Sequence, residues 1–324
     1  MMQRIAMYLP SLAAALACAL AIVPAAAQDY PSRPVKLVVP YPAGSGPDQL
    51  ARVLAQVLQS ALGGSVIVDN KAGALGVIGT TEVARSKPDG YTLLLTTNTT
   101  QAANVALVKN LGYDPVKDFA PVSRVTVTPM VLLVNPNLPA RDLASFVAFA
   151  KSRPEGFSGG YGSAASLVSM AKLKATGAFT AIDVPYKGIP LAVNDLLGGQ
   201  ISFTFADLPV GMPQIQGGKL RGIAVTSLKR AANDPNLPAI AELYPGFEVI
   251  GWQGVVAPAG TPPAIVKKLA DAIAAGVAKP EIHDKLVAMH HGVNVLGPEA
   301  FAAFIDSEIR KWKKDATEAG LEAQ

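Results

Sequence analysis

One segment near the start of the chain has the pattern of a buried strand, a loop and a helix. An apolar run at residues 36–39 leads into a loop rich in glycine and proline, and leucine and valine then recur at helical spacing over residues 49–62. Gly63 and Gly64 end that helix. Because a helix N-terminus carries unpaired N–H groups and the positive end of the helix dipole, the loop is suited to hold an anionic group.

Strand-like and helix-like segments go on alternating along the chain, which is typical of an α/β fold with a mostly parallel sheet. Further strands are predicted at residues 65–69, 91–96, 157–161, 181–184, 200–205 and 221–225. Two other β-rich runs, at residues 122–134 and 248–257, are predicted to cross between two lobes and to act as the hinge. We predict one lobe from residues 28–128 and 254–324, and a second lobe from residues 129–253.

The first 27 residues have the pattern of an export signal. Arg4 supplies positive charge, an alanine- and leucine-rich run follows, and small residues precede a cleavage site near Ala27. A retained membrane anchor is the weaker interpretation, because the apolar run is short and contains proline. Cys18, the single cysteine, lies inside this run, so we expect the mature protein to be exported and to contain no disulfide.

The charge and composition exclude several classes of function. A net charge of +4 without a block of lysine and arginine gives no indication of nucleic-acid binding. Acidic residues are scattered singly, and we expect the three histidines, His283, His290 and His291, to be exposed on or beside one late helix rather than to bind a metal. Ser45 and Ser163 lack the spacing of a nucleophile elbow. We therefore expect no catalytic residue, metal or cofactor.

Loops rich in small and hydroxyl residues follow four of the predicted strands. Two of them occupy equivalent strand–loop–helix positions in the two lobes, so that two opposed helix N-termini can clasp one carboxylate through N–H groups, hydroxyls and bridging water. We expect Asp48 to cap its helix with the side chain turned away from the cleft. The candidate ligand-binding residues are Tyr41, Pro42, Ala43, Gly44, Ser45, Asp48, Asn98, Thr99, Gly162, Ser163, Ala164, Ala165, Ser166 and Asp207.

Several motifs carry a family resemblance that extends from residue 30 to the end. They are YPSRP at 30–34, PYPAG at 40–44, NKAGA at 70–74, PDGYTLL at 88–94, VPYKG at 184–188, DLLGGQ at 195–200, GKLR at 218–221 and APAGTP at 257–262. With these motifs the chain resembles the Bug family of periplasmic solute receptors, which are related to tripartite tricarboxylate transporters. The resemblance implies a two-lobed periplasmic-binding-protein fold of the Venus flytrap type (type II), without catalytic activity.

The resemblance also implies a small organic acid as ligand, such as a dicarboxylate, an aromatic acid or an amino acid. In the family two loops act as a pincer on one carboxylate, often through ordered water; here these are residues 41–48 and 162–166, with Asn98 and Asp207 near the rest of the ligand. The second loop departs from the family pattern, because it is shorter and lacks a later glycine and histidine. We expect a monomer that meets membrane transporter subunits or a sensor kinase.

Two alternatives remain open at this point. One is a secreted hydrolase that uses Ser45 or Ser163 on the same two-lobed fold. The other is a receptor that contacts only a partner protein and whose cleft is filled by its own side chains.

Overall fold

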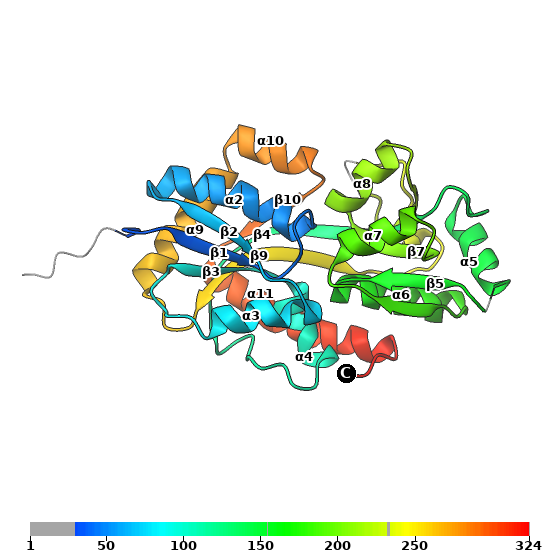
Figure 1. Cartoon of the computed structure of the whole chain (residues 1–324), viewed down its shortest axis with the longest axis horizontal. Helices are drawn as coiled ribbons and strands as arrows, with labels where there is room; N and C mark the ends of the chain where they lie inside the picture. The colour runs from blue at the N-terminus through cyan, green and yellow to red at the C-terminus, as the bar shows by residue number, and fades with distance from the viewer. Residues whose placement is uncertain (1–29, 154, 232–233, 324) are drawn as a thin grey trace, which may run out of the picture.

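A computed structural model describes residues 30–153, 155–231 and 234–323 of the chain. The predicted signal peptide at residues 1–27 lies outside the described residues. Figure 1 shows two groups of strands and helices, which β4 and β9 connect as long neighbouring strands. This confirms the predicted two-lobed α/β fold with two connecting β segments. The lobe boundaries after residues 128 and 253 stay a prediction.

The first lobe contains a mixed sheet in the order β2–β1–β3–β9–β4, with β10 paired to β4. Its strands are β1 (Val35–Val39), β2 (Val66–Asn70), β3 (Thr92–Thr97), β4 (Phe119–Val134), β9 (Ile250–Pro258) and β10 (Gly292–Leu296). Its helices are α2 (Gly46–Leu62), α3 (Val77–Ala84), α4 (Asn104–Leu107), α9 (Pro263–Val277), α10 (Pro280–Ala288) and α11 (Pro298–Glu318), with short helical turns at Ala74–Gly76 and Thr99–Ala103.

The second lobe contains the order β4–β7–β5–β6, with β8 on the other side of β4. Its other strands are β5 (Ser158–Tyr161), β6 (Ile182–Pro185), β7 (Phe203–Asp207) and β8 (Arg221–Val225). Its helices are α5 (Leu143–Lys151), α6 (Ala164–Gly177), α7 (Ile189–Leu197) and α8 (Leu208–Gln216), with a short turn at Ile240–Glu242.

The expectation of a mostly parallel sheet is correct only for the outer strands. Strands β1, β2 and β3 pair in parallel, as do β5, β6 and β7, but β4 and β9 run antiparallel to their neighbours because each returns across the molecule. β4 changes partner within its length: Pro129 pairs with Ile250 of β9, and Met130 pairs with Asp207 of β7. Proline cannot donate to a ladder, which suits the point at which one pairing ends and the next begins.

The cores follow from the amphipathic faces of the helices. In the first lobe Leu50, Leu54 and Leu58 of α2 are buried on one face, in a cluster with Leu269 and Ile273 of α9. The second lobe has a cluster of phenylalanines in edge-on, tilted and stacked contact: Phe146, Phe157, Phe179 and Phe203.

Helix α11 packs against β4, and it is the lowest long helix in the view of Figure 1. Its Phe301, Ile305 and Trp312 are buried. Glu308 Oε2 accepts from the indole N–H of Trp252 at 2.7 Å and of Trp312 at 2.9 Å, which fixes the helix to β9. In the part of the chain that the structure describes, no helix combines the length and the apolar character needed to cross a bilayer.

Candidate functional site

The loops at the strand ends of both lobes, together with β4 and β9, enclose a cavity. The cavity has a volume of about 40 Å³, which is room for roughly three waters. The cavity is lined by Tyr41, Ser45, Pro47, Thr97, Asn98, Thr99, Thr128, Met130, Gly162, Ser163, Ala165, Ile189, Asp207, Gly251, Trp252 and Gln253. Residues far apart in the sequence thus face one space between the lobes.

The first loop is fixed by Ser45, which is the N-cap of α2. The Ser45 hydroxyl accepts from the Asp48 N–H at 3.3 Å and donates to the Pro42 carbonyl at 2.7 Å. Gly44 has a φ of 81°, a backbone conformation that glycine adopts without strain. Tyr41 is buried, its hydroxyl lies 2.7 Å from Thr97 Oγ1, and burial raises the pKa of Tyr41 to about 12. The helix therefore begins three residues earlier than predicted, with Pro47 in its first turn.

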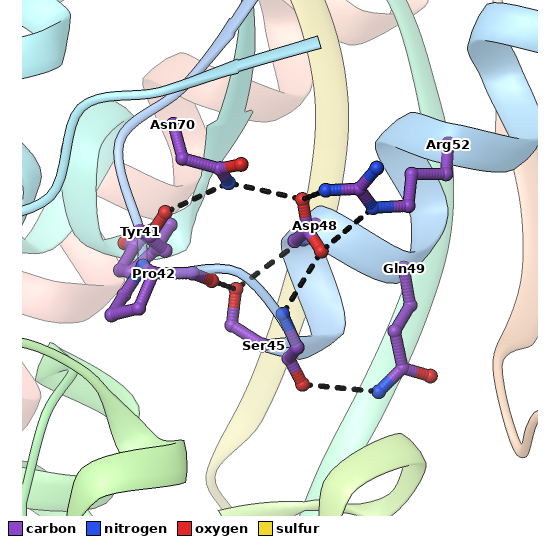
Figure 2. Close-up of polar contacts among 8 residues, drawn as sticks. Tyr41, Pro42, Ser45, Asp48, Gln49, Arg52 and Asn70 are labelled. Carbon is purple, nitrogen blue, oxygen red and sulfur yellow. Dashed lines mark hydrogen bonds and ion pairs between the residues drawn. The ribbon is translucent and has the colours of Figure 1, made fainter.

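Asp48 is turned away from the cavity, as predicted, but it is not the cap. Its carboxylate accepts from Arg52 at 3.0 Å through both oxygens, from the Gly44 N–H at 2.9 Å and from the Asn70 amide at 3.0 Å, as Figure 2 shows. Burial alone raises its pKa, but the hydrogen bonds from Arg52, Gly44 and Asn70 outweigh burial and hold the pKa below its ordinary value. Asp48 therefore stabilises the first loop from the side that faces away from the cavity.

Replacing Asp48 by asparagine is expected to lower the free energy of unfolding by about 2 kcal/mol, because buried donors lose a charged acceptor. Urea denaturation at pH 7 measures the change. Asp271→Asn is the matched control: Asp271 pairs with Lys267 one helical turn away, but both side chains are exposed, so that change is expected to cost less than about 0.5 kcal/mol. Equal losses in the two variants would contradict the supporting role of Asp48.

The second loop is held by a capping box at the start of α6. The Ser163 hydroxyl accepts from the Ser166 N–H at 3.2 Å, and the Ser166 hydroxyl accepts from the N–H groups of Gly162 and Ser163 at 3.1 Å. Ser166 is fully buried and does not line the cavity. The Ala164 N–H donates to Thr99 Oγ1 of the first lobe at 3.1 Å, so the two lobes are hydrogen-bonded to each other beside the cavity.

Asp207 is the last residue of β7 and precedes α8. It is 9% exposed, and a Cβ added to Gly46 would lie 1.7 Å from its Oδ2, so the carboxylate lies directly against the N-terminus of α2. Burial raises the pKa of Asp207 to about 6, although hydrogen bonds from its own backbone N–H and from Gly46 lower it in part. The absence of a side chain at Gly46 lets the lobes approach this closely.

Polar atoms without a hydrogen-bond partner gather at this cavity. Within the described part of the chain these buried atoms are Asn98 Nδ2, Thr128 Oγ1, Asp207 Oδ2 and Gln253 Oε1. Native proteins leave few buried polar groups unpaired, because each costs free energy. Groups that converge on one space are therefore explained by a polar molecule that binds there.

The structure brings most of the predicted site residues to the cavity. Tyr41, Ser45, Asn98, Thr99, Gly162, Ser163, Ala165 and Asp207 line it, whereas Pro42, Ala43, Gly44, Asp48, Ala164 and Ser166 do not. Pro47 and Thr97 also line the cavity; they lie in the predicted loops at residues 41–48 and 97–100 but were not among the individual candidates. The sequence interpretation missed Thr128, Met130, Ile189, Gly251, Trp252 and Gln253. Their signal is weak: Thr128 and Gln253 are two of several polar residues in the crossing segments, which were interpreted only as a hinge.

Within the described chain, neither hydroxyl group proposed for a hydrolase is hydrogen-bonded to a catalytic base. Ser45 Oγ donates to a backbone carbonyl, and Ser163 Oγ contacts Ser166 Oγ. None of the cavity-lining residues in the described ranges is a histidine, and the described residues contain no group of three or more metal-ligating side chains. The expectation of exposed histidines holds for His283 but is wrong for His291, which is completely buried, and for His290, whose side chain is only 13% exposed.

The family model for the tripartite tricarboxylate transporter family receptor (TctC) matches residues 50–321. The chain belongs to this family, which includes the Bug receptors. The protein BugT of Bordetella pertussis is 37% identical over 302 residues, which cover 92% of each chain.

Solved structures give the same result for the fold. The structure of the periplasmic binding protein BugD is 37% identical, with a TM-score of 0.87, and the alignment covers 91% of this chain and all of that one. The structure of Rpa4515 from R. palustris with adipate is 33% identical, with a TM-score of 0.89 and the same coverage. The fold is therefore that of a family of solute-binding receptors.

Proposed function

We propose that the protein is a periplasmic receptor that binds one small organic carboxylate between its lobes and does not change it chemically. The observation that carries the proposal is the cavity itself, where unpartnered and nearly buried polar side chains from both lobes and both connecting strands converge. That cavity also argues against a cleft filled by its own side chains. The adipate bound by the related Rpa4515 supports a carboxylate as ligand.

The geometry supports binding of the carboxylate by dipoles rather than by a cation. The N-termini of α2 and α6 face the cavity through Ser45 and Ser163, and the amide of Asn98 adds a donor. None of the described residues that line the cavity is a lysine or an arginine. Hydrogen-bond donors of this kind hold an anion without a salt bridge, and ordered water can complete the contacts.

Closure of the lobes is the proposed mechanism. Because the cavity has a volume of only about 40 Å³, we propose that the lobes separate to admit the acid and then close over it. We propose the lobes at residues 28–128 with 254–324 and at residues 129–253, with Pro129 of β4 at the hinge. The closed receptor would then deliver the acid to membrane transporter subunits or to a sensor kinase, acting as a monomer after its signal peptide is cleaved near Ala27.

Titration calorimetry against a panel of mono- and dicarboxylates tests the proposal. At least one acid is expected to bind with a Kd on the order of 1 μM or tighter, and mass spectrometry of molecules released from the purified protein identifies further candidates. Failure of every acid in the panel and of every released molecule to bind would contradict the proposal. Turnover of a bound acid that is lost on Ser163→Ala would instead favour the hydrolase.

The fluorescence of the two tryptophans of the chain can show whether the ligand binds in this cavity. Trp252 lines the cavity, whereas Trp312 lies on α11 behind it, and both donate to the same Glu308 oxygen. A ligand-induced change in tryptophan fluorescence is therefore expected to persist in Trp312→Phe and to disappear in Trp252→Phe. The opposite result would place the ligand outside this cavity.

A further inference from the structure

Asp207 is the one carboxylate among the residues that line the cavity. Its Oδ2 has no partner in the described chain, and it lies against Gly46 at the start of α2, where the lobes meet. The other unpartnered side chains at the cavity, on Asn98, Thr128 and Gln253, are neutral. Asp207 is therefore the only cavity-lining group, within the described ranges, that carries a formal charge at neutral pH.

No cationic side chain of the described cavity lining neutralises that charge. The described cavity lining contains no lysine, arginine or histidine, and its one other titratable group is the Tyr41 hydroxyl, which stays protonated. Arg52 of α2, one helical turn after the first loop, does not line the cavity and is hydrogen-bonded to Asp48. Above pH 6 a second negative charge placed beside Asp207 thus meets a nearly buried carboxylate that has no cationic partner in the cavity lining.

A ligand can therefore satisfy Asp207 in only one chemical way at neutral pH, by donating a hydrogen bond. We propose that Asp207 selects acids that carry an ammonium or hydroxyl group in addition to their carboxylate, and that it disfavours acids with a second carboxylate at that position. The inference rests on the proposed function, because it names the class of acid that the same cavity takes. The carboxylate of the ligand would lie toward Asn98 and the start of α6, and the donor toward Asp207.

Matched ligand pairs test the selection by calorimetry at pH 8. In each pair an ammonium group replaces a carboxylate on the same carbon skeleton: L-alanine against methylmalonate, and 5-aminovalerate against adipate. The first pair places the donor next to the carboxylate, and the second places it four carbons away. In at least one pair the amino member is expected to bind at least about 10-fold tighter than the diacid.

Asp207→Asn removes the charge and keeps the size of the side chain. In this variant the preference for the amino member is expected to fall to about 1 or to reverse. Thr128→Val is the control, because it removes a neutral polar group of the same cavity; it is expected to weaken both members of a pair and to leave their ratio unchanged. Thermal melting verifies that both variants fold. The relative affinity of the two members of each ligand pair is also measured in the unmodified protein, so that part of the test does not depend on either variant.

The outcomes separate this inference from the proposed function. Tighter binding of the diacid in the unmodified protein, or a ratio that Asp207→Asn leaves unchanged, overturns the role of Asp207 while acids still bind. If no acid of either kind binds, the proposed function fails and this inference fails with it.

Discussion

Replacing Gly188 by alanine is expected to weaken ligand binding by about 5- to 150-fold and to leave the fold intact. Gly188 precedes α7 in the second lobe, and a Cβ there would lie 2.4 Å from Cδ of Pro42, in the first loop of the other lobe. The backbone at Gly188 is extended, so alanine fits its own lobe without strain. The proline ring is rigid and cannot turn aside, so the lobes must stay slightly apart.

Calorimetry with an acid that binds the unmodified protein measures the loss. Gly297→Ala is the matched control, because Gly297 is also an extended residue before a helix but has open space around its Cβ position. Pro42→Ala, made in the Gly188→Ala background, is expected to restore most of the affinity by removing the opposing ring. Unchanged affinity in Gly188→Ala, or no recovery in the double variant, would show that this contact does not limit closure.

Part of the site could be predicted because local sequence fixes it. Asn98 and Asp207 follow the ends of apolar strands, and residues at the carboxyl ends of strands meet at the ligand-binding edge of an α/β sheet. Ser45 and Ser163 precede helices and have hydroxyl groups that cap them, so their positions were also predictable. In each case a few neighbouring residues determine both the backbone and the direction of the side chain.

The contribution of the connecting strands could not be predicted in the same way. Thr128, Trp252 and Gln253 lie in extended segments where either face is compatible with the sequence, and the placement of the two lobes decides which face meets the cavity. The partners of Asp48 show the same limit. Arg52 is one helical turn away and was within reach of a sequence argument, but Asn70 comes from β2 and meets Asp48 only through the parallel pairing of β1 with β2.

His291 shows why burial of a polar residue is hard to predict. Two consecutive histidines after a helix suggest an exposed turn. In the structure His290 adopts a φ of 60° and ends α10, and the chain then enters β10, which directs the next side chain inward. His290 instead pairs with Asp234 at 2.9 Å. The left-handed backbone of His290 thus lets its own side chain contact Asp234 while the next side chain, His291, is buried.

Replacing His291 by leucine is expected to stabilise the protein by about 2 kcal/mol at pH 7 and by more at acid pH. The imidazole is fully buried, and neither of its ring nitrogens has a partner in the described chain, so an apolar side chain of similar size removes an unsatisfied group. Burial, with a smaller effect of His290, lowers the pKa of His291 to about 4. The stability that depends on a neutral His291 is complete above pH 6.5 and is lost as the pH falls toward 4, by about 3 kcal/mol.

The contribution of Asp207 to the free energy of unfolding has the opposite pH dependence, so the effects of His291 and Asp207 can be measured separately. Its raised pKa means that its contribution is complete below about pH 4 and is lost as the pH rises through about 6. Between pH 4 and 6 the effects of His291 and Asp207 on the free energy of unfolding have opposite signs. The free energy of unfolding of the unmodified protein is therefore expected to change little over this range. His291→Leu removes the contribution of His291 to this pH dependence and leaves that of Asp207. The free energy of unfolding of this variant is therefore expected to rise as the pH falls from 7 to 4.

Urea denaturation at half-unit steps from pH 4 to 8, followed by tryptophan fluorescence, measures these curves. His283→Leu is the control, because His283 is exposed on α10 and its loss is expected to leave the curve of the unmodified protein unchanged. Combining His291→Leu with Asp207→Asn is expected to remove both slopes and to flatten the profile. Parallel curves for His291→Leu and the unmodified protein would show that the buried imidazole does not control stability in acid.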